Sequence, residues 1–170
     1  GGHAGIDSAG YTLVRRFRDG VHAQVLAPLG LHSPDDTTRQ LEDVVWRLVT
    51  RGPQHLLSST YASWDELVAA VAREVVASCA GRMAECRWGK LNTSAIVHPL
   101  SASVPLLGRF VDMPHTALPG DNNLPRVQGP RHGASERLVV SPGREEHGLL
   151  HMPAGQSGHP LAPYFGAGHA

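Results

Sequence analysis

The sequence predicts an α+β fold, with a helical first half and a second half rich in hairpins and loops. Proline placement is the first observation, because only three of the thirteen prolines precede Pro99 and the other ten lie between Pro99 and Pro163. Hydrophobic spacing is the second, because apolar residues recur at helical intervals in the first half and in short runs between turn residues in the second. We expect helices over about residues 7–85 and strands and loops over about residues 86–170, within one partial domain covering residues 1–170.

The composition is that of a globular chain without a strongly charged surface. Apolar residues make up 41% of the 170, charged residues 18%, and the formal net charge is zero. We therefore expect no nucleic acid and no anionic membrane as partner, since either would favour a basic excess. No apolar run reaches the roughly 20 residues that cross a bilayer. The chain starts at Gly1 without an initiator methionine or a signal-like segment, and we expect both ends to be cuts.

The first helix is predicted from about Asp7 or Ser8 to Leu26. Its apolar face is formed by residues at helical spacing, Leu13, Val14, Phe17, Val21 and Val25. A solvated face is expected for the arginines of this stretch, Arg15, Arg16 and Arg18.

The second helix is predicted from Ser33 to Arg51. Ser33 suits the N-cap, and Pro34 suits the first helical position, where no backbone donor is needed. Gly52 and Pro53 then end the helix. Its apolar stripe is formed by Leu41, Val44, Val45 and Leu48.

The third helix has the clearest start signal, a capping box in which Ser63 and Glu66 satisfy each other's backbone donors. Its predicted buried face is formed by Leu67, Val68, Val71, Val75 and Cys79. Three amphipathic helices in sequence need a partner surface, and we expect strands from the second half to provide it.

The two cysteines give no disulfide framework. On one continuous helix, Cys79 and Cys86 would lie about 10.5 Å apart along the axis, beyond the roughly 7 Å Cα limit for a bridge. A break near Gly81 would bring them closer, so a bridge stays open as an alternative. We expect two small buried hydrophobic residues.

Two strand regions are predicted in the second half. The first is a weakly alternating segment over residues 88–98, followed by Pro99. The second is a hairpin that pairs residues 136–140 with residues 148–152, with Pro142 and Gly143 at the central positions of a type II turn. Residues 100–132 carry no periodicity, and such a long loop is expected to be functional or to wrap a partner.

Two serines resemble catalytic nucleophiles only superficially. Ser157 departs from the G-x-S-x-G elbow, because His159 stands where the second glycine belongs. Pro160 directly afterwards prevents the helix that an elbow needs. We expect a structural turn at Ser157, and we expect Ser135 to lie at the start of a strand.

His147 and His151 have the spacing of helical zinc ligands, but Gly148 and the neighbouring turn favour a strand. On a strand the two rings would lie roughly 13 Å apart, too far to share one ion. Asp121-Asn122-Asn123 is interpreted as a turn rather than a calcium loop, and Glu145-Glu146 as a solvated tip. We therefore expect no metal site. A non-catalytic interaction or metal-binding module that uses this His-rich hairpin is the alternative function.

Five segments, in order along the chain, resemble the penicillin acylase family, and from the first to the last they span nearly all of it. They are residues 7–18, residues 88–93 (Trp-Gly-Lys-Leu-Asn-Thr) with the following His98-Pro-Leu, residues 119–129, residues 135–143 and residues 152–160. Ala154 is a small departure, since the family often has glycine at this position.

The resemblance implies an αββα sandwich made from a precursor that cuts itself into two subunits. In this family, the new N-terminal serine of the large subunit is the nucleophile, and its α-amine, with a pKa of roughly 8, takes the proton. An asparagine and a backbone amide stabilise the oxyanion. Neither element carries over, because Gly1 is not serine and the family's asparagine lies upstream; Asn92 and Asn122 match structural positions. We therefore assign no catalytic, substrate-binding or metal-binding residue.

By this resemblance, the chain is the C-terminal structural portion of the large subunit of an amidohydrolase. The substrates would be β-lactams with a side-chain amide, or related N-acyl compounds such as acyl-homoserine lactones. Expected partners are the upstream remainder of the large subunit, the small subunit and a small-molecule N-acyl substrate. The expected location is the bacterial periplasm or the exterior. No cofactor is expected in this segment, and any calcium of the family would bind elsewhere. The isolated chain is expected to be inactive, and either poorly soluble or partly unfolded.

Overall fold

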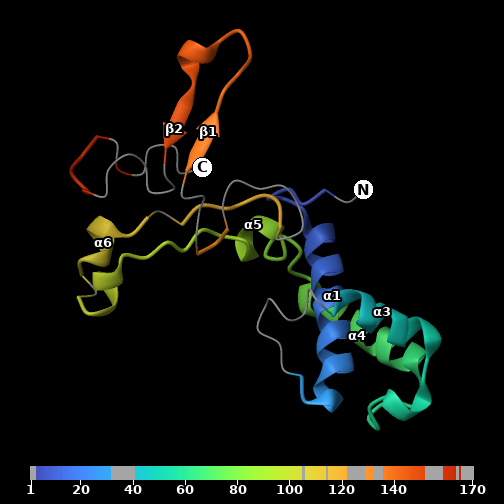
Figure 1. Ribbon diagram of the computed structural model, residues 1–170. Coiled ribbons are helices and arrows are strands. Elements are labelled where there is room, and N and C mark those ends of the chain that lie inside the picture. The colour runs from blue at the N-terminus through green and yellow to red at the C-terminus, as the bar shows by residue number, and fades with distance from the viewer. Residues whose placement is uncertain are drawn as a thin grey trace. The chain divides into compact units, whose positions relative to one another are not determined.

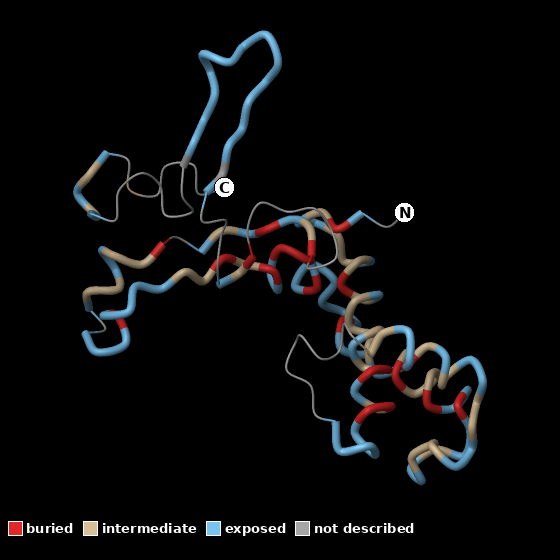
Figure 2. The backbone as a smooth tube through the Cα atoms, viewed as in Figure 1, coloured by how far each residue is buried: buried red, intermediate tan, exposed pale blue. Residues whose placement is uncertain are grey.

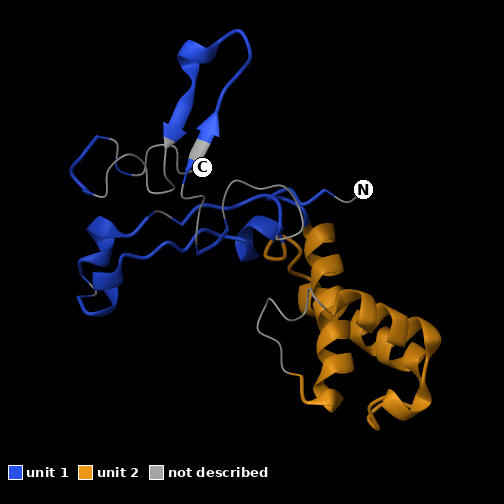
Figure 3. Ribbon diagram, in the orientation of Figure 1, with its two compact units in different colours: residues 1–8, 87–170 blue, residues 9–86 orange. Residues whose placement is uncertain are grey.

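The computed structural model describes residues 3–31, 41–104, 106–113, 115–121, 129–131, 136–151, 159–163 and 165. The chain divides into two compact units, one of Ala9–Cys86 and one of Gly1–Ser8 with Arg87–Ala170 (Figure 3). We call them the helical unit and the loop-rich unit. That the whole chain forms one partial domain stays a prediction.

The helical unit contains all three predicted helices (Figure 1). They are α1 (Ala9–Leu26), α3 (Glu42–Arg51) and α4 (Trp64–Cys79). Two short 3₁₀ turns accompany them, η1 (Ala27–Leu29) and η2 (Gln54–Leu56). The second helix was predicted to run unbroken from Ser33 to Arg51, but α3 begins at Glu42, with Leu41 as its N-cap, so that extent is wrong. Ser33 and Pro34 themselves lie outside the described residues.

The ends of α3 and α4 follow their local sequence signals. Gly52 has the left-handed φ of 61°, and its N–H donates to the carbonyl of Leu48 at 2.9 Å, which confirms the predicted end of α3. Ser63 Oγ accepts a hydrogen bond from the N–H of Glu66 at 3.1 Å. The Glu66 carboxylate accepts from the N–H of Ala62 at 2.7 Å, one residue before the donor that a capping box predicts.

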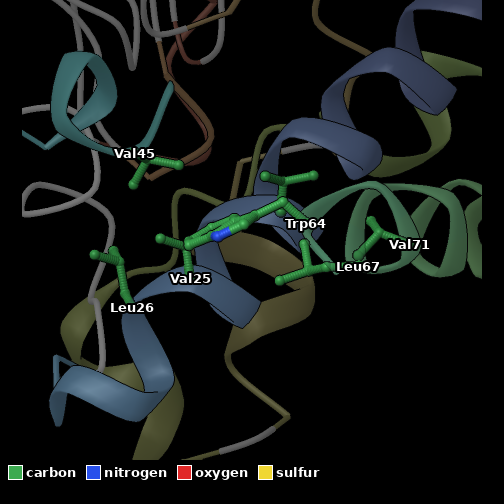
Figure 4. Packing of buried hydrophobic residues seen from close by; sticks show 7 residues of the cluster. Val25, Leu26, Val45, Trp64, Leu67 and Val71 are labelled. Atoms are coloured by element: carbon green, nitrogen blue, oxygen red, sulfur yellow. The ribbon is translucent and has the colours of Figure 1, made fainter. Parts of the chain in front are cut away.

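The core of the helical unit lies between its own helices (Figure 2). Its buried members are Val21, Val25, Leu26, Val45, Trp64, Leu67 and Val71. Figure 4 shows that α1, α3 and α4 all contribute to this cluster. The apolar helix faces therefore pack on one another, a result that differs from our expectation that strands would cover them.

The strand predicted over residues 88–98 is wrong at its start, where the chain forms the helical turn α5 (Trp88–Leu91). Residues 93–98 run antiparallel to the described residues 112–113 and 115–118. The backbone N–H groups of Ser94, Met113 and Leu118 donate across this pair to Thr116, Ile96 and Asn92 at 2.7–3.1 Å.

Side chains replace backbone groups at several positions of this pair. Ser94 Oγ accepts from the N–H of Thr116 at 2.8 Å, and Asp112 Oδ1 accepts from the N–H of His98 at 2.8 Å. Only Thr93 and Ala117 form a regular bridge among the described residues of this pair. The alternation of apolar residues was too weak to impose a regular ladder, and polar side chains close it instead.

The predicted long loop contains two short helical turns, η3 (Pro99–Ala102) and α6 (Gly108–Val111). Both lie in the connection between the paired segments, so residues 98–112 form a local excursion rather than a featureless loop. Its exposed apolar side chains are Leu100, Val104, Leu106 and Phe110.

The predicted hairpin is confirmed. Its antiparallel strands are β1 (Arg137–Val139) and β2 (Leu149–His151), and Leu138 lies opposite Leu150. Between them, Gly143 has φ 79° and the N–H of Arg144 donates to the carbonyl of Ser141 at 2.9 Å, as the predicted turn requires. The connection then continues through η4 (Glu145–His147).

The described residues thus form a mostly helical structure with one small two-stranded antiparallel sheet. The α+β class is confirmed at this coarse level, whereas the αββα sandwich stays a prediction. None of the described helices combines the length and apolar character needed to cross a membrane.

Candidate functional site

Parts of three of the five segments that resemble the penicillin acylase family meet around Trp88 in the loop-rich unit. The N–H of Trp88 donates to the carbonyl of Ser8 at 3.1 Å, and the N–H of Gly89 donates to that of Ile6 at 2.8 Å. The N–H of Gly120 donates to the carbonyl of Ala4 at 2.9 Å. Residues 4–8, 88–93 and 118–121 are therefore joined by direct hydrogen bonds, and we call this arrangement the Trp88 cluster.

Two side chains of the Trp88 cluster converge on the carbonyl of Gly120. The Trp88 indole Nε1 donates to it at 2.7 Å, and Asn92 Nδ2 donates to it at 3.2 Å. Asn92 Nδ2 also donates to the carbonyl of Leu118 at 2.7 Å. Both amide hydrogens of Asn92 are therefore committed to the backbone, and Asn92 is 4% exposed. An oxyanion donor needs a free amide hydrogen, so this geometry fits the structural position that we expected for Asn92.

The close packing around Gly89 explains why the Trp88 cluster requires a glycine after Trp88. A Cβ at this position would lie 2.9 Å from the Cβ atoms of both Ile6 and Ala117. Any larger residue would push residues 4–8 away from Trp88. Asp121, from the predicted turn, is a buried member of the Trp88 cluster, and Asn122 and Asn123 lie outside the described residues.

A second polar cluster closes the excursion of residues 98–112. Asp112 Oδ1 accepts from Ser101 Oγ at 2.5 Å and from the N–H of His98 at 2.8 Å. These two hydrogen bonds, with Ser101 contributing most, hold the pKa of Asp112 below its usual value. His98 Nδ1 accepts from the N–H of Leu100 at 3.2 Å. Serine, histidine and aspartate are present, but Ser101 donates to the carboxylate rather than to the histidine, so they form a structural clasp and not a catalytic triad.

The helical unit contains a polar cluster that the sequence analysis missed. Its centre is the Glu42 carboxylate, which accepts hydrogen bonds from the Arg18 guanidinium and from Trp46 Nε1, the latter at 2.7 Å. Burial raises the pKa of Glu42, but the hydrogen bonds from Arg18 and Trp46 outweigh burial and leave the pKa lowered. Residues 18 and 42 lie too far apart in sequence for periodicity to reveal this pairing.

His22 lies in the same cluster, with a fully buried side chain. Its Nε2 is 3.4 Å from Glu42 Oε2, and its ring stands edge-on to Trp46, with ring centres 6.2 Å apart. Among the described residues, neither ring nitrogen has a hydrogen bond of normal geometry. Burial lowers the pKa of His22 and outweighs the attraction of Glu42, so the imidazole is neutral near pH 7.

Cys79 and Cys86 form a disulfide, which corrects our expectation of two separate buried thiols. α4 ends at Cys79, and Gly81 has φ 71°, so the chain reverses after the helix. The Cα atoms then lie 5.9 Å apart, within reach of a bridge. The distance that argued against the bridge assumed a continuous helix, and Gly81 was the signal that decided otherwise.

The arginines of α1 are not a solvated face, so that expectation is wrong. Arg18 is bound to Glu42 and Asp19, and Arg15 pairs with Asp19 at 3.3 Å. Arg16 Nη1 donates to Ser78 Oγ at 2.9 Å. Each of the three therefore has a partner within the helical unit.

The remaining candidates do not form a site. His147 lies in η4 with its Nε2 3.5 Å from Glu146 Oε1, and His151 lies in β2, so the two do not share one helix. The expected strand at His147 is corrected to a 3₁₀ turn. Glu145, as expected, is exposed at the hairpin tip. Ser135 and Ser157 lie outside the described residues. Within the part of the chain that the structure describes, no three His, Cys, Asp or Glu side chains are grouped to hold a metal ion.

Among the described residues, the geometry is that of a structural region, in which polar side chains tie loops together and none is arranged as a nucleophile with its base. The family model for penicillin amidase matches residues 2–167. The chain therefore belongs to the penicillin amidase family, a family of N-terminal-nucleophile amide hydrolases. No curated protein matches the chain.

Proposed function

We propose that this chain is the C-terminal structural portion of the large subunit of a penicillin-amidase-like amidohydrolase, and that it forms a single partial domain of that enzyme. Enzymes of this family are heterodimers processed from one precursor. In this proposal, the nucleophilic serine and the oxyanion groups come from upstream, and residues 1–170 contribute no catalytic residue. The substrates are β-lactams with a side-chain amide, or related N-acyl compounds such as acyl-homoserine lactones.

The observation that carries the proposal is the exposure of both faces of the β1–β2 hairpin. Leu138 and Leu150 lie opposite each other on one face and are 67% and 52% exposed. Val139 and Leu149 lie opposite each other on the other face and are 51% and 44% exposed. A hairpin with one side in solvent would be polar on that side, and a two-stranded sheet is marginal alone. Apolar residues on both faces suit strands inserted between two layers, as in an αββα sandwich.

The disulfide supports an oxidising location for the protein. Disulfides persist in secreted and periplasmic proteins and are rare in the cytosol, where thiol buffers reduce them. The Cys79–Cys86 bridge therefore agrees with a bacterial periplasmic or secreted enzyme.

The test is to express the complete reading frame that contains these residues and to assay it. Expected results are a precursor that appears as two subunits on a denaturing gel and release of a primary amine from N-acylated substrates, tested with a penicillin and with an acyl-homoserine lactone. A product that is unprocessed and releases no amine from either substrate contradicts the proposal.

The role of the hairpin is tested in the same protein. Leu138→Asp combined with Leu150→Asp places two charges on one face and should lower the yield of soluble, processed enzyme at least about tenfold, because a buried charge has a high desolvation cost. Glu145→Gln, at the exposed tip of the same hairpin, is the matched control and should process normally. Normal processing of the double variant would show that this face stays in solvent.

A further inference from the structure

The Cys79–Cys86 disulfide has a cation beside it. Arg16 Nη1 lies 3.4 Å from Cys79 Sγ and 3.8 Å from Cys86 Sγ, and it also donates to Ser78 Oγ. A guanidinium within reach of a sulfur favours the thiolate over the thiol. A disulfide sulfur carries no net charge, so the charge of Arg16 would act most strongly on these sulfurs when the bridge opens and a thiolate forms.

We propose that Cys79–Cys86 is a thiol–disulfide exchange site for a small dithiol reductant, in which Arg16 is the positioning residue that stabilises the departing Cys79 thiolate. The proposal goes beyond the amidohydrolase function and does not rest on it, since it uses only contacts within the helical unit. Its consequence is a junction that is closed when oxidised and open when reduced.

Surface features place the bridge within reach of a small reductant. A groove of about 440 Å³ between α1 and α4 is lined by Arg16 and Ser78, the two residues that contact Cys79 Sγ. On the other side, residues 80–85 are all exposed and lead directly to Cys86. Both sulfurs are buried at rest, so the reductant has to displace a side chain of the groove or the 80–85 segment.

The exchange is balanced in two steps. A thiolate of the dithiol attacks Cys86 Sγ, a new sulfur–sulfur bond forms, and the Cys79–Cys86 bond breaks with its electron pair on Cys79. The second thiolate of the reductant then attacks its own bonded sulfur, which releases Cys86 as a thiolate and the reductant as a cyclic disulfide. The bridge gains two electrons and the dithiol loses two. A better-stabilised leaving thiolate departs faster, and Cys79 is the sulfur closer to Arg16.

Opening the bridge releases the segment at which the chain leaves the helical unit. Cys86 is the last residue of that unit, and Arg87 is the first residue of the following part of the loop-rich unit. Besides the bridge, residues 79–86 contain turn hydrogen bonds from the N–H groups of Arg82, Glu85 and Cys86 at 2.9–3.1 Å. Arg82 is exposed within this segment, so trypsin should cleave after it much faster in the reduced protein.

The experiment equilibrates the intact protein with dithiothreitol in its reduced and oxidised forms, traps free thiols by alkylation and quantifies the Cys79 and Cys86 peptides by mass spectrometry. We expect reduction while the helical circular dichroism is retained. Arg16→Gln should slow reduction roughly tenfold and make the disulfide roughly tenfold harder to reduce at equilibrium, a shift of about 30 mV. Arg16→Lys should recover most of both effects, and Arg73→Gln, an exposed arginine on α4, should change neither.

A second variant separates an electrostatic role from a packing role of Arg16. In Cys86→Ser, Cys79 is the single remaining cysteine, and its alkylation rate against pH should show a midpoint below the roughly 8.5 of an ordinary thiol. Adding Arg16→Gln should move that midpoint upward. A bridge that dithiothreitol opens only when the helices melt overturns the proposal. So does a Cys79 alkylation profile that Arg16→Gln leaves unchanged.

Discussion

The helical unit and the loop-rich unit differ in the kind of interaction that stabilises each of them internally. The helical unit encloses a continuous apolar cluster between three helices and adds a disulfide at the end of α4. The buried residues of the loop-rich unit include Asn92, Ser94, Ser101 and Asp121, and its hairpin leaves apolar side chains exposed on both faces. Each unit leaves some apolar side chains exposed, among them Val14 and Val76 of the helical unit. The helical unit nevertheless encloses its main apolar cluster with its own helices, whereas the loop-rich unit ties its backbone with polar side chains and leaves both faces of its hairpin apolar and exposed.

The difference shows which sequence signals act locally. Helical periodicity assembles a core from neighbouring segments, because each amphipathic helix covers the next. The loop-rich unit instead depends on single residues whose partners are distant in sequence, such as Trp88 with Gly120 and Gly89 with Ile6. Such contacts are specific, but the described residues of this unit form no apolar cluster like that of the helical unit, so we expect it to have less stability of its own.

The sharpest test of this contrast makes the same substitution in both units. Leu67 is 1% exposed in the helical core, and Leu138 is 67% exposed on the hairpin. In the 170-residue chain, Leu67→Ala should lower the free energy of unfolding by about 3 kcal/mol, because it removes buried methyl groups and leaves a cavity. Leu138→Ala should change it by less than about 0.5 kcal/mol. Urea unfolding followed by circular dichroism measures both. Equal losses would mean that the hairpin face is already covered within this chain.

The contribution of side-chain hydrogen bonds to the Trp88 cluster is tested by substituting Asn92. Asn92→Ala removes both donors, which leaves the buried carbonyl of Leu118 without this partner and the carbonyl of Gly120 with one side-chain donor fewer, and this should cost about 2 kcal/mol. Hydrogen exchange should show the loss at residues 88–93 and 115–121, with little change in α4. Lys90→Ala is the control in the same segment, since its side chain is exposed. Equal hydrogen-exchange rates in both variants would show that the Asn92 hydrogen bonds do not hold the Trp88 cluster together.

The two units also show how far prediction from the sequence reaches. The three helices, the end of α3 at Gly52 and the hairpin with its turn were predicted, because each depends on residues within one turn or one strand of each other. The clasp at Asp112, the Glu42 cluster and the disulfide were not, because they join residues whose proximity follows from tertiary packing or from a helix break. The strand predicted over residues 88–98 failed for the same reason, since its partner segment closes the pair with side chains.

A smaller effect is expected at the start of α4, where stability of the helical unit depends on a cap rather than on burial. Ser63→Ala removes the acceptor for the N–H of Glu66 and should lower the stability of the helical unit by about 1 kcal/mol. Ser63→Asp keeps an acceptor at the same place and should restore stability. Thermal unfolding of both variants measures the difference. A Ser63→Ala variant as stable as the parent would show that Glu66 alone, through Ala62, fixes the helix start.

The smallest effect is a pH dependence confined to the helical unit. Burial holds the pKa of His22 below its ordinary value, so the unfolded chain binds a proton that the folded unit does not. Stability is therefore complete well above the unfolded pKa of about 6.5 and falls as pH decreases through it. From about pH 7.5 to about 6.5 the loss is at most about 0.4 kcal/mol, and it grows at lower pH. His22→Gln should flatten this slope, whereas His55→Gln, an exposed histidine of the same unit, should leave it unchanged. Urea midpoints measured across this range decide the matter. A slope that survives in His22→Gln would assign it to another group and would remove His22 from the features that distinguish the helical unit.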